Sequence, residues 1–198
     1  MTSVAGRVKL RRSVTARSDY VWASNADVDV YTHLTRPVVV TMQPEVDHLV
    51  ECGLVEKALD RSAQANGLTS DGLSGFAAQH CRDTLVSILN ADSNLNVTTR
   101  RVNQKKKGPF ISAQNRLGGS RFRQVSIEQH ARTGAARELV EDGTWARIER
   151  AVVQSGERID EAIAQFSEDE SMHRDGRKLL GGAGDELARV LSLLEVGS

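Results

Sequence analysis

The sequence is poor in several residue types that mark specialised protein classes. Of 198 residues, two are cysteines, three are prolines and 4% are aromatic. Cys52 and Cys81 form no CxxC pair, which argues against a disulfide framework, so we expect two buried thiols. With so few aromatics, the core must consist mainly of Val, Leu, Ile and Ala. We expect Trp22 and Trp145 to belong to that core, with a role as interface anchors as the alternative.

Other absences bear on location and chemistry. No apolar run approaches the length that spans a bilayer, and the basic N-terminal region has no apolar segment typical of a secretory signal. The sequence also contains no GxGxxG, GxxxxGK[ST], GxSxG or HExxH pattern. These absences remove the usual reasons for proposing a membrane protein, a secreted protein or an enzyme.

The formal net charge is zero, but the charges are arranged in blocks. Residues 1–17 carry about +5, residues 19–92 about −7, residues 93–127 about +8 and residues 128–198 about −6. Blocks of alternating sign allow attraction inside the fold or between copies of the chain. A dedicated nucleic-acid binder is more often basic overall, and near-zero net charge promotes association. The charge pattern therefore favours self-assembly.

The second basic block predicts a β-hairpin with a long tip. Residues 95–102 and 121–127 have strand-like composition. Gly108 and Pro109 break the chain between them, so we expect residues 104–120 to form a long loop. The cations of this hairpin and of the N-terminal arm are the predicted contacts to a neighbouring subunit or to nucleic acid: Arg7, Lys9, Arg11, Arg12, Arg100, Arg101, Lys105, Lys106, Lys107, Arg116, Arg121 and Arg123.

Three interpretations of this basic stretch stay open. It is a solvated loop without a partner, an arm that contacts phosphates and releases their counterions, or an arm that docks on an acidic patch of a neighbouring subunit. Phe110 and Phe122 are the only aromatics here, too few for a base-stacking platform. Replacing Lys105, Lys106 and Lys107 by Ala should leave the melting temperature nearly unchanged but weaken assembly or nucleic-acid retention.

The first half of the chain predicts a small sheet followed by helices. Residues 7–15, 19–23, 27–31 and 37–42 are candidate strands of an antiparallel sheet. The last of these begins at a proline, which a strand start tolerates, and we expect its three consecutive valines to be fully buried.

After these candidate strands, the apolar residues recur at helical spacing. Pro44 suits the first turn of a helix over residues 44–67. Residues 70–89 form the clearest helix of this half. Residues 129–140 predict another helix.

The C-terminal region predicts a helical pair. After a break at Asp142-Gly143, apolar residues recur with a 3-4-3-4 spacing in two helices joined by an acid-rich turn over residues 167–176. An antiparallel arrangement follows from the short connection. Whether the seam closes within the chain, on the sheet or on another subunit is open. The seam residues are Trp145, Ile148, Val152, Ile159, Phe166, Leu180, Leu187, Val190 and Leu194.

One polar constellation could carry chemistry. Asp27, Asp29, Tyr31 and His33 alternate, so on a single strand they would share a face and could bind a divalent cation. A solvent-facing polar strand face is the simpler alternative.

Together these patterns predict an α+β fold with a small N-terminal antiparallel β region, central helices, a long basic β-hairpin and a C-terminal antiparallel helical pair. We expect a body over residues 1–128, with residues 129–198 as part of the same domain or a small appendage.

The expected function is that of a non-enzymatic structural subunit of a homo-oligomeric assembly, by analogy with viral or phage coat, neck, connector or tail components. Its expected partners are further copies of itself, other assembly subunits and nucleic acid, without a membrane, metal or cofactor. Its expected location is the virion or the cytoplasm. The alternatives are a DNA- or RNA-binding regulatory or packaging protein and a metal-dependent enzyme that uses Asp27, Asp29 and His33.

Overall fold

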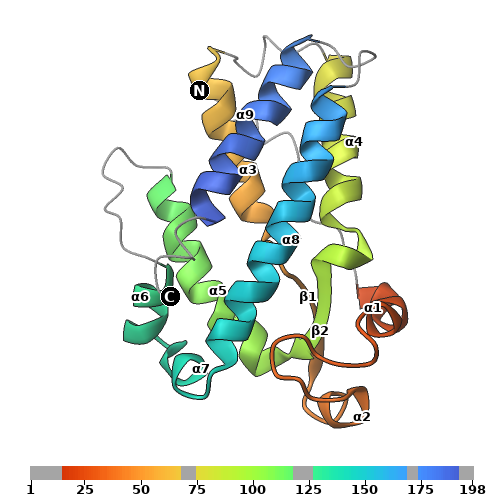
Figure 1. Cartoon of the computed structure of the whole chain (residues 1–198), viewed down its shortest axis with the longest axis vertical. Coiled ribbons are helices and arrows are strands. Elements are labelled where there is room, and N and C mark those ends of the chain that lie inside the picture. The colour runs from red at the N-terminus through yellow and green to blue at the C-terminus, as the bar shows by residue number, and fades with distance from the viewer. Residues whose placement is uncertain (1–14, 68–74, 118–126, 169–173, 192–198) are drawn as a thin grey trace.

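The computed structural model of the chain describes residues 15–67, 75–117, 127–168 and 174–191. These residues form an α+β fold, as predicted, that is mostly helical and contains a two-stranded antiparallel sheet (Figure 1). In chain order the elements are η2 (Thr15–Arg17), α1 (Ser18–Ser24), α2 (Arg36–Val39), β1 (Pro44–His48), α3 (Cys52–Ala65), α4 (Gly75–Leu89), η3 (Asp92–Asn94), β2 (Leu95–Thr99), α5 (Arg100–Leu117), α6 (Ile127–Thr133), α7 (Arg137–Glu141), α8 (Thr144–Ser167) and α9 (Arg174–Leu191).

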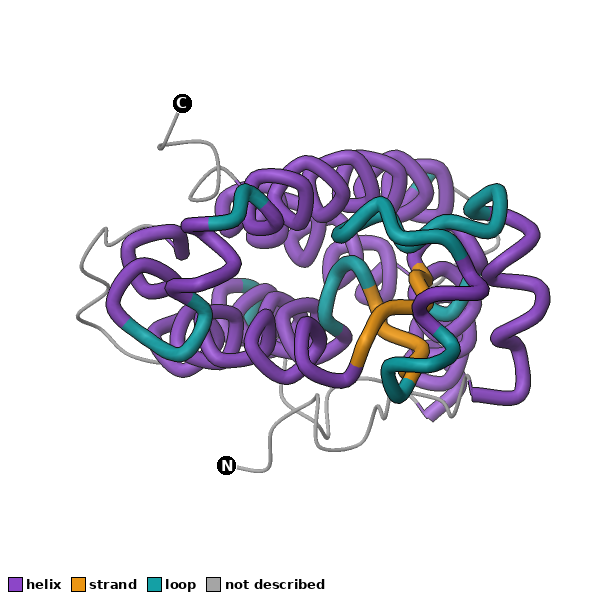
Figure 2. The backbone as a smooth tube through the Cα atoms, turned by 90° about the horizontal axis from the view of Figure 1, so that it is seen from below, coloured by secondary structure: helices purple, strands orange, loops and turns teal. Residues whose placement is uncertain are grey.

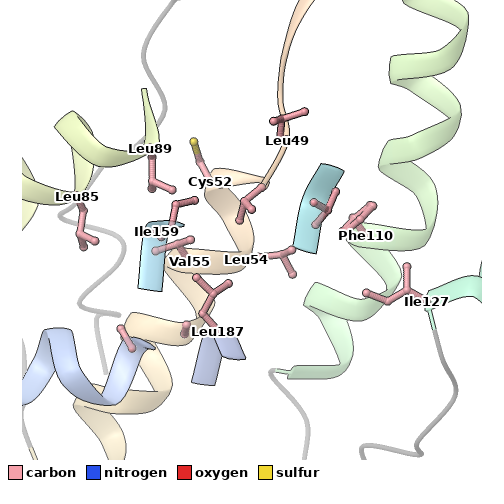
Figure 3. Packing of buried hydrophobic residues seen from close by; sticks show 14 of the residues in the cluster. Leu49, Cys52, Leu54, Val55, Leu85, Leu89, Phe110, Ile127, Ile159 and Leu187 are labelled. Carbon is pink, nitrogen blue, oxygen red and sulfur yellow. The ribbon is translucent and has the colours of Figure 1, made fainter. Parts of the chain in front are cut away.

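The long helices α3, α4, α8 and α9 pack together along the long axis of the molecule (Figure 1). Helices α8 and α9 run in opposite directions, so the predicted C-terminal helical pair is confirmed. Figure 3 shows the main hydrophobic core, in which side chains from α4 and from α5 and α6 lie on either side of α3. Because this core joins residues from Tyr31 to Leu187, it spans both predicted regions of the chain.

The helical seam closes within the chain. Most of its residues are at most 2% exposed and belong to the main core: Trp145, Ile148, Val152, Ile159, Leu180 and Leu187. Phe166 is 37% exposed, so the seam opens to solvent near the end of α8. Val190 lies in α9, but its side chain and the whole of Leu194 lie outside the described residues.

Glycines in α9 allow its close approach to two other helices. A Cβ atom at Gly182 would lie 2.3 Å from Ser62 Oγ on α3, and one at Gly184 would lie 2.7 Å from Asp160 Oδ1 on α8. Glycine lowers helix propensity, but here it removes the side chain that would keep the helices apart. Gly182 and Gly184, which weaken α9 as an isolated helix, therefore favour its close packing on α3 and α8.

Asn94, at the end of η3, connects distant parts of the bundle. Its Nδ2 donates to the carbonyls of Val50 and Leu89, at 3.3 and 2.9 Å. Its Oδ1 accepts from Val50 N at 2.8 Å and from Ser155 Oγ at 2.7 Å. The side chain is 1% exposed, so all its hydrogen-bonding capacity is used inside the protein.

The sheet pairs two strands that are far apart in sequence. Strands β1 and β2 are antiparallel, with register from Pro44↔Thr99 to His48↔Leu95, and the chain between them contains α3 and α4. Figure 2 shows the two strands side by side, with loops around them. One face of the sheet packs on a small core made by α1, α2 and β2: Val21, Trp22, Val39, Leu95 and Val97.

Several strands predicted in the N-terminal region are wrong. Residues 19–23 lie in α1, residues 27–31 form turns with only Val28 in an isolated bridge, and residues 36–39 form α2. Left-handed φ angles of 53° at Ala26 and 57° at Asp27 interrupt any extended strand there. Residues 7–14 lie outside the described residues.

The predicted buried valine strand is also wrong. Val39 is buried in the small core, whereas Val38 and Val40 are 43% and 49% exposed. A proline in the first turn of α2 favours the helix, which turns successive side chains to different sides.

The helix predicted over residues 44–67 begins later, because residues 44–48 form β1 and α3 starts at Cys52. The predicted helix over residues 70–89 corresponds to α4, of which Gly75–Leu89 is described. The helix predicted over residues 129–140 is divided into α6 and α7.

The basic β-hairpin is not formed by the described residues. Residues 100–117 are helical, β2 pairs with β1, and Ile127 begins α6. Residues 121–126, the rest of the second predicted strand, lie outside the described residues. Pro109 lies inside α5, where it removes a helical hydrogen bond. Burial of Pro109 and of Phe110, which is 1% exposed, holds the helix against the core in spite of that loss.

Among the described helices, none combines the length and apolar character that a membrane crossing requires.

Candidate functional site: a buried polar layer around Lys106

A layer of polar side chains covers the second face of the sheet. Because side chains alternate along a strand, Glu45 and Asp47 point away from the small core that Val46 contacts. The register places them beside Thr98 and Asn96 of β2. Two further parts of the chain complete this layer: helix α5, and the turns that follow α1. Its members, which we call the polar layer, are Asp29, Tyr31, Glu45, Asp47, Asn96, Thr98, Asn103 and Lys106.

Lys106 occupies the centre of the polar layer. Its Nζ donates to Asp47 Oδ2 at 2.6 Å and to the carbonyl of His48, and it lies 3.5 Å from Glu51 Oε1. The lysine and aspartate side chains are both 0% exposed. Nζ also lies 5.5 Å from the ring centroid of Tyr31 and 5.6 Å from that of Phe110. These aromatic faces add attraction for the buried ammonium group.

Tyr31 and Asp29 bind the N-terminal turns to this layer. Tyr31 donates its hydroxyl to Asp47 Oδ2 at 2.9 Å. Burial, followed by the negative charge and hydrogen bonding of Asp47, raises the pKa of Tyr31 well above its usual value. Asp29 accepts hydrogen bonds from four donors, namely Tyr31 N, Thr32 Oγ1, Asn96 Nδ2 and Thr98 Oγ1, at distances from 2.6 to 3.0 Å. An ionised carboxylate is stabilised by such donors.

A second cross-link joins α5 to β1. Asn103 Nδ2 donates to Glu45 Oε2 at 2.8 Å, one helical turn before Lys106. Asn103 is 2% exposed. The pairs Asn103–Glu45 and Lys106–Asp47 therefore hold the same two elements together, side by side.

A small cleft borders the polar layer. It has a volume of about 280 Å³ and lies between the start of α3 and α5, lined by Glu51, Cys52, Gly53, Glu56, Lys107, Phe110 and Ile111. Glu51 belongs to both places, since it lines the cleft and faces Lys106. The ammonium group of Lys106 itself is sealed from this cleft and from solvent.

The remaining cations of α5 lie on its surface and are partly paired within the chain. Arg100 Nε lies 3.6 Å from Glu45, Arg101 lies 2.7 Å from Glu138, and Lys105 pairs with the same Glu138. Lys107 lines the cleft. The side chain of Arg116 and the whole of Arg7, Lys9, Arg11, Arg12, Arg121 and Arg123 lie outside the described residues.

The side chains considered as a metal site do not come together. Asp27 is exposed and lies 3.6 Å from Arg36, Asp29 is buried in the polar layer, and His33 is exposed with a left-handed φ of 61°. Without a strand over residues 27–33, these side chains share no face. Within the described ranges, no group of three or more His, Cys, Asp or Glu side chains is placed to hold a metal ion.

The cysteines and tryptophans belong to the interior, as predicted. Cys52 and Cys81 are buried thiols. Burial raises the pKa of Cys81 to about 11, and its Sγ donates to the Gly176 carbonyl at 3.7 Å. Trp22 and Trp145 are each 2% exposed.

The polar layer was not predicted as a site, although two patterns point to it. Val102, Lys106 and Phe110 are four residues apart, a helical spacing that places the lysine on the apolar face of α5. Glu45 and Asp47 are two apart, as on one face of a strand. The arrangement pairs the buried charges of Lys106 and Asp47 and joins three parts of the chain, and both of these side chains are closed to solvent.

No protein-family model matches the chain, and no curated protein or solved structure shows significant similarity to it.

Proposed function

We propose that this protein is a non-enzymatic structural subunit of a homo-oligomeric assembly. The observation that carries the proposal is an exposed ridge of large apolar side chains: Val38, Val40 and Met42, which we call the apolar ridge, are 43%, 49% and 47% exposed. Exposed apolar side chains gathered in one segment are typical of protein–protein contact sites. A self-complementary patch of this kind suits a symmetric contact between copies.

The ridge is held in a defined position. Val39, in the middle of the segment, is fully buried in the small core. Arg36, at the start of α2, pairs with Asp19 of α1 and lies 3.6 Å from Asp27. The turn after α2 is also held by backbone hydrogen bonds, from Val40 N to Arg36 O and from Met42 N to Val39 O. The exposed side chains of the apolar ridge are therefore presented to a partner without a large ordering cost.

The ion pairs of α5 argue against assembly through the cations of residues 100–107. Arg100, Arg101 and Lys105 lie beside carboxylates of their own chain, and Lys106 is buried. These four cations are therefore less available to phosphates or to an acidic neighbour than an extended basic loop would be, which favours assembly over nucleic-acid binding. The basic residues of the N-terminal arm remain candidates for a second, charge-dependent contact.

The test is the oligomeric state of the purified chain at low and high salt, measured by sedimentation velocity at micromolar concentration. An apolar contact persists when salt screens exposed charges. We expect a multimer in both conditions and a shift to monomer when all three ridge residues are replaced by Ser. Ile111→Ser, at an apolar side chain that is 50% exposed on α5, serves as the control and should leave the multimer intact.

A chain that is monomeric in both salts contradicts the proposed function. A multimer that resists the ridge substitutions but dissociates at high salt would instead place the contact on charged surfaces. By analogy, the proposal includes viral or phage coat, neck, connector and tail components, and with them a location in the virion or the cytoplasm.

A further inference from the structure

Two oxygen atoms of the polar layer are buried without a hydrogen-bond donor from the residues that the structure describes. They are Asp47 Oδ1 and Asn103 Oδ1. Buried acceptors in folded proteins are nearly always paired, with protein donors or with an ordered water molecule. The two atoms belong to β1 and α5, which the contacts Lys106–Asp47 and Asn103–Glu45 already join, so a donor placed between these elements would satisfy both.

The orientation of both groups is determined by their other contacts. Asn103 must direct its Nδ2 toward Glu45 Oε2, 2.8 Å away, because a flipped amide would place its oxygen against the carboxylate. Asp47 Oδ2 already accepts from Lys106 and from Tyr31. The atoms left without a donor are consequently the second carboxylate oxygen of Asp47 and the amide oxygen of Asn103.

The two oxygens come from neighbouring positions. Asn103 and Lys106 are three residues apart on α5, a rise of about 4.5 Å. Their partners Glu45 and Asp47 are two apart on β1, about 6.6 Å. The cross-links Asn103–Glu45 and Lys106–Asp47 therefore join the same helix and strand, one helical turn apart, and a water molecule that donates in two directions over about 2.8 Å can bridge acceptors on the two elements.

We propose that one water molecule is buried between β1 and α5 and donates one hydrogen to Asp47 Oδ1 and the other to Asn103 Oδ1. Water fits this place better than a cation. The ammonium group of Lys106 lies 2.6 Å from the same Asp47 carboxylate and would repel a second positive charge. Buried waters generally make two to four hydrogen bonds to groups that would otherwise be unsatisfied.

This water makes Asn103 a positioning residue of the polar layer. Through its two amide atoms, Asn103 holds Glu45 directly and Asp47 through the water. The water then gives Asp47 Oδ1 a donor, beside Lys106 and Tyr31, which both donate to Oδ2. This inference is independent of the proposed assembly.

The test is a crystal structure of the full chain at a resolution that shows ordered water, compared with the Asn103→Leu variant. We expect a single density peak about 2.6–3.2 Å from both Oδ1 atoms, and its absence in the variant. Absence of the peak from the native protein, a protein donor on either oxygen, or a peak with the short distances and high coordination of a metal ion would each overturn the proposal. Should the variant fail to fold, the native structure alone decides.

In solution, ¹⁷O relaxation dispersion counts water molecules with long residence times. The native chain should contain one more such water than Asn103→Leu. Ser93→Ala, at an exposed position of η3, is the control and should keep the native count. Equal counts in the native chain and in a folded Asn103→Leu variant would contradict the proposal.

Discussion

Lys106 Nζ lies 2.6 Å from Asp47 Oδ2, and neither side chain is exposed to solvent. This contact joins α5 to β1 across 59 residues of sequence. A buried ion pair gains little net stability over apolar packing, but removal of one partner leaves the other charge buried and unpaired. The pair is thus a point where a single substitution should have a large effect.

Replacing Lys106 by Met should strongly destabilise the protein. The variant keeps most of the side-chain volume but leaves Asp47 with Tyr31 as its remaining side-chain donor. We expect a loss of about 3–5 kcal/mol in the free energy of unfolding, measured by urea denaturation. Lys107→Met, at the next position and beside the cleft, is the matched control and should change stability by less than about 0.5 kcal/mol.

This prediction reverses the expectation that Lys105, Lys106 and Lys107 could all be replaced by Ala without a change in melting temperature. A Lys106→Met variant as stable as the native chain would show that the lysine reaches solvent.

Replacing Asn94 by Ala should also be costly. The substitution leaves the carbonyls of Val50 and Leu89, the amide of Val50 and the hydroxyl of Ser155 without their partner. We expect a loss of about 2–4 kcal/mol, since each buried polar group left unpaired costs about 1–3 kcal/mol before relaxation. Thermal and urea unfolding measure the loss.

Asn94→Asp provides a further check on the bonding. It keeps an oxygen for Val50 N but turns an acceptor toward two carbonyls, so it should be no more stable than Asn94→Ala. If Asn94→Ala changed stability as little as the exposed control Ser93→Ala, the hydrogen bonds of Asn94 would contribute nothing.

Two adjacent glycines of α9 should respond in opposite ways to alanine. A Cβ at Gly181 meets no atom within 4 Å, so Gly181→Ala should stabilise the helix by up to about 1 kcal/mol. A Cβ at Gly182 would lie 2.3 Å from Ser62 Oγ and 3.1 Å from Ser62 Cβ. Ser62 Oγ donates to the Leu179 carbonyl at 2.9 Å, which resists its rotation.

Gly182→Ala should therefore destabilise the protein by about 1–3 kcal/mol, as measured by urea denaturation. Adding Ser62→Gly should recover part of that loss, because it removes both clashing atoms. Equal stabilisation by Gly181→Ala and Gly182→Ala would mean that α3 and α9 are farther apart than described here.

Asp160 should make stability depend on pH. Burial, followed by the negative charges of Asp185 and Glu161, raises the pKa of Asp160 above its usual value of 3.8. Between the unfolded and the folded pKa, the folded chain binds more protons than the unfolded chain, so this group lowers stability as pH rises. The full penalty is present above the folded pKa.

Asp160→Asn should accordingly be more stable than the native chain at pH 7, and the difference should shrink as pH falls through the raised pKa of folded Asp160 toward the usual value of 3.8. Urea denaturation across this range measures it, with Glu157→Gln on the exposed side of α8 as the control. A difference that grows toward acid pH would have the wrong sign and contradict the prediction.

Pro37 and Pro44 show the limit of predicting secondary structure from neighbouring residues alone. The sequence predicts a strand at Pro37 and a helix at Pro44, and the structure has α2 at the first and β1 at the second. The fixed φ of proline suits both a first helical turn and the start of a strand. Pairing with β2, about fifty residues later, decides the second case.

The basic stretch shows the same limit for the candidate site. Lys105, Lys106 and Lys107 look equivalent in the sequence, and the structure places them beside Glu138, inside the polar layer and beside the cleft, respectively. Gly108 and Pro109 suggested a loop, but Arg, Lys and Gln are good helix formers, and the burial of Phe110 decided for the helix.

The sequence by itself determined the helical pair α8 and α9, the break at Gly143 and the interior position of both cysteines and both tryptophans, because apolar spacing and turn residues act over a few neighbouring positions. The tertiary structure alone decided the pairing of β1 with β2, the polar layer and the burial of Lys106. The strand pairs join residues 47 to 55 positions apart and Lys106 contacts Asp47 across 59, and the stability of these features arises only when the complete fold excludes water from them.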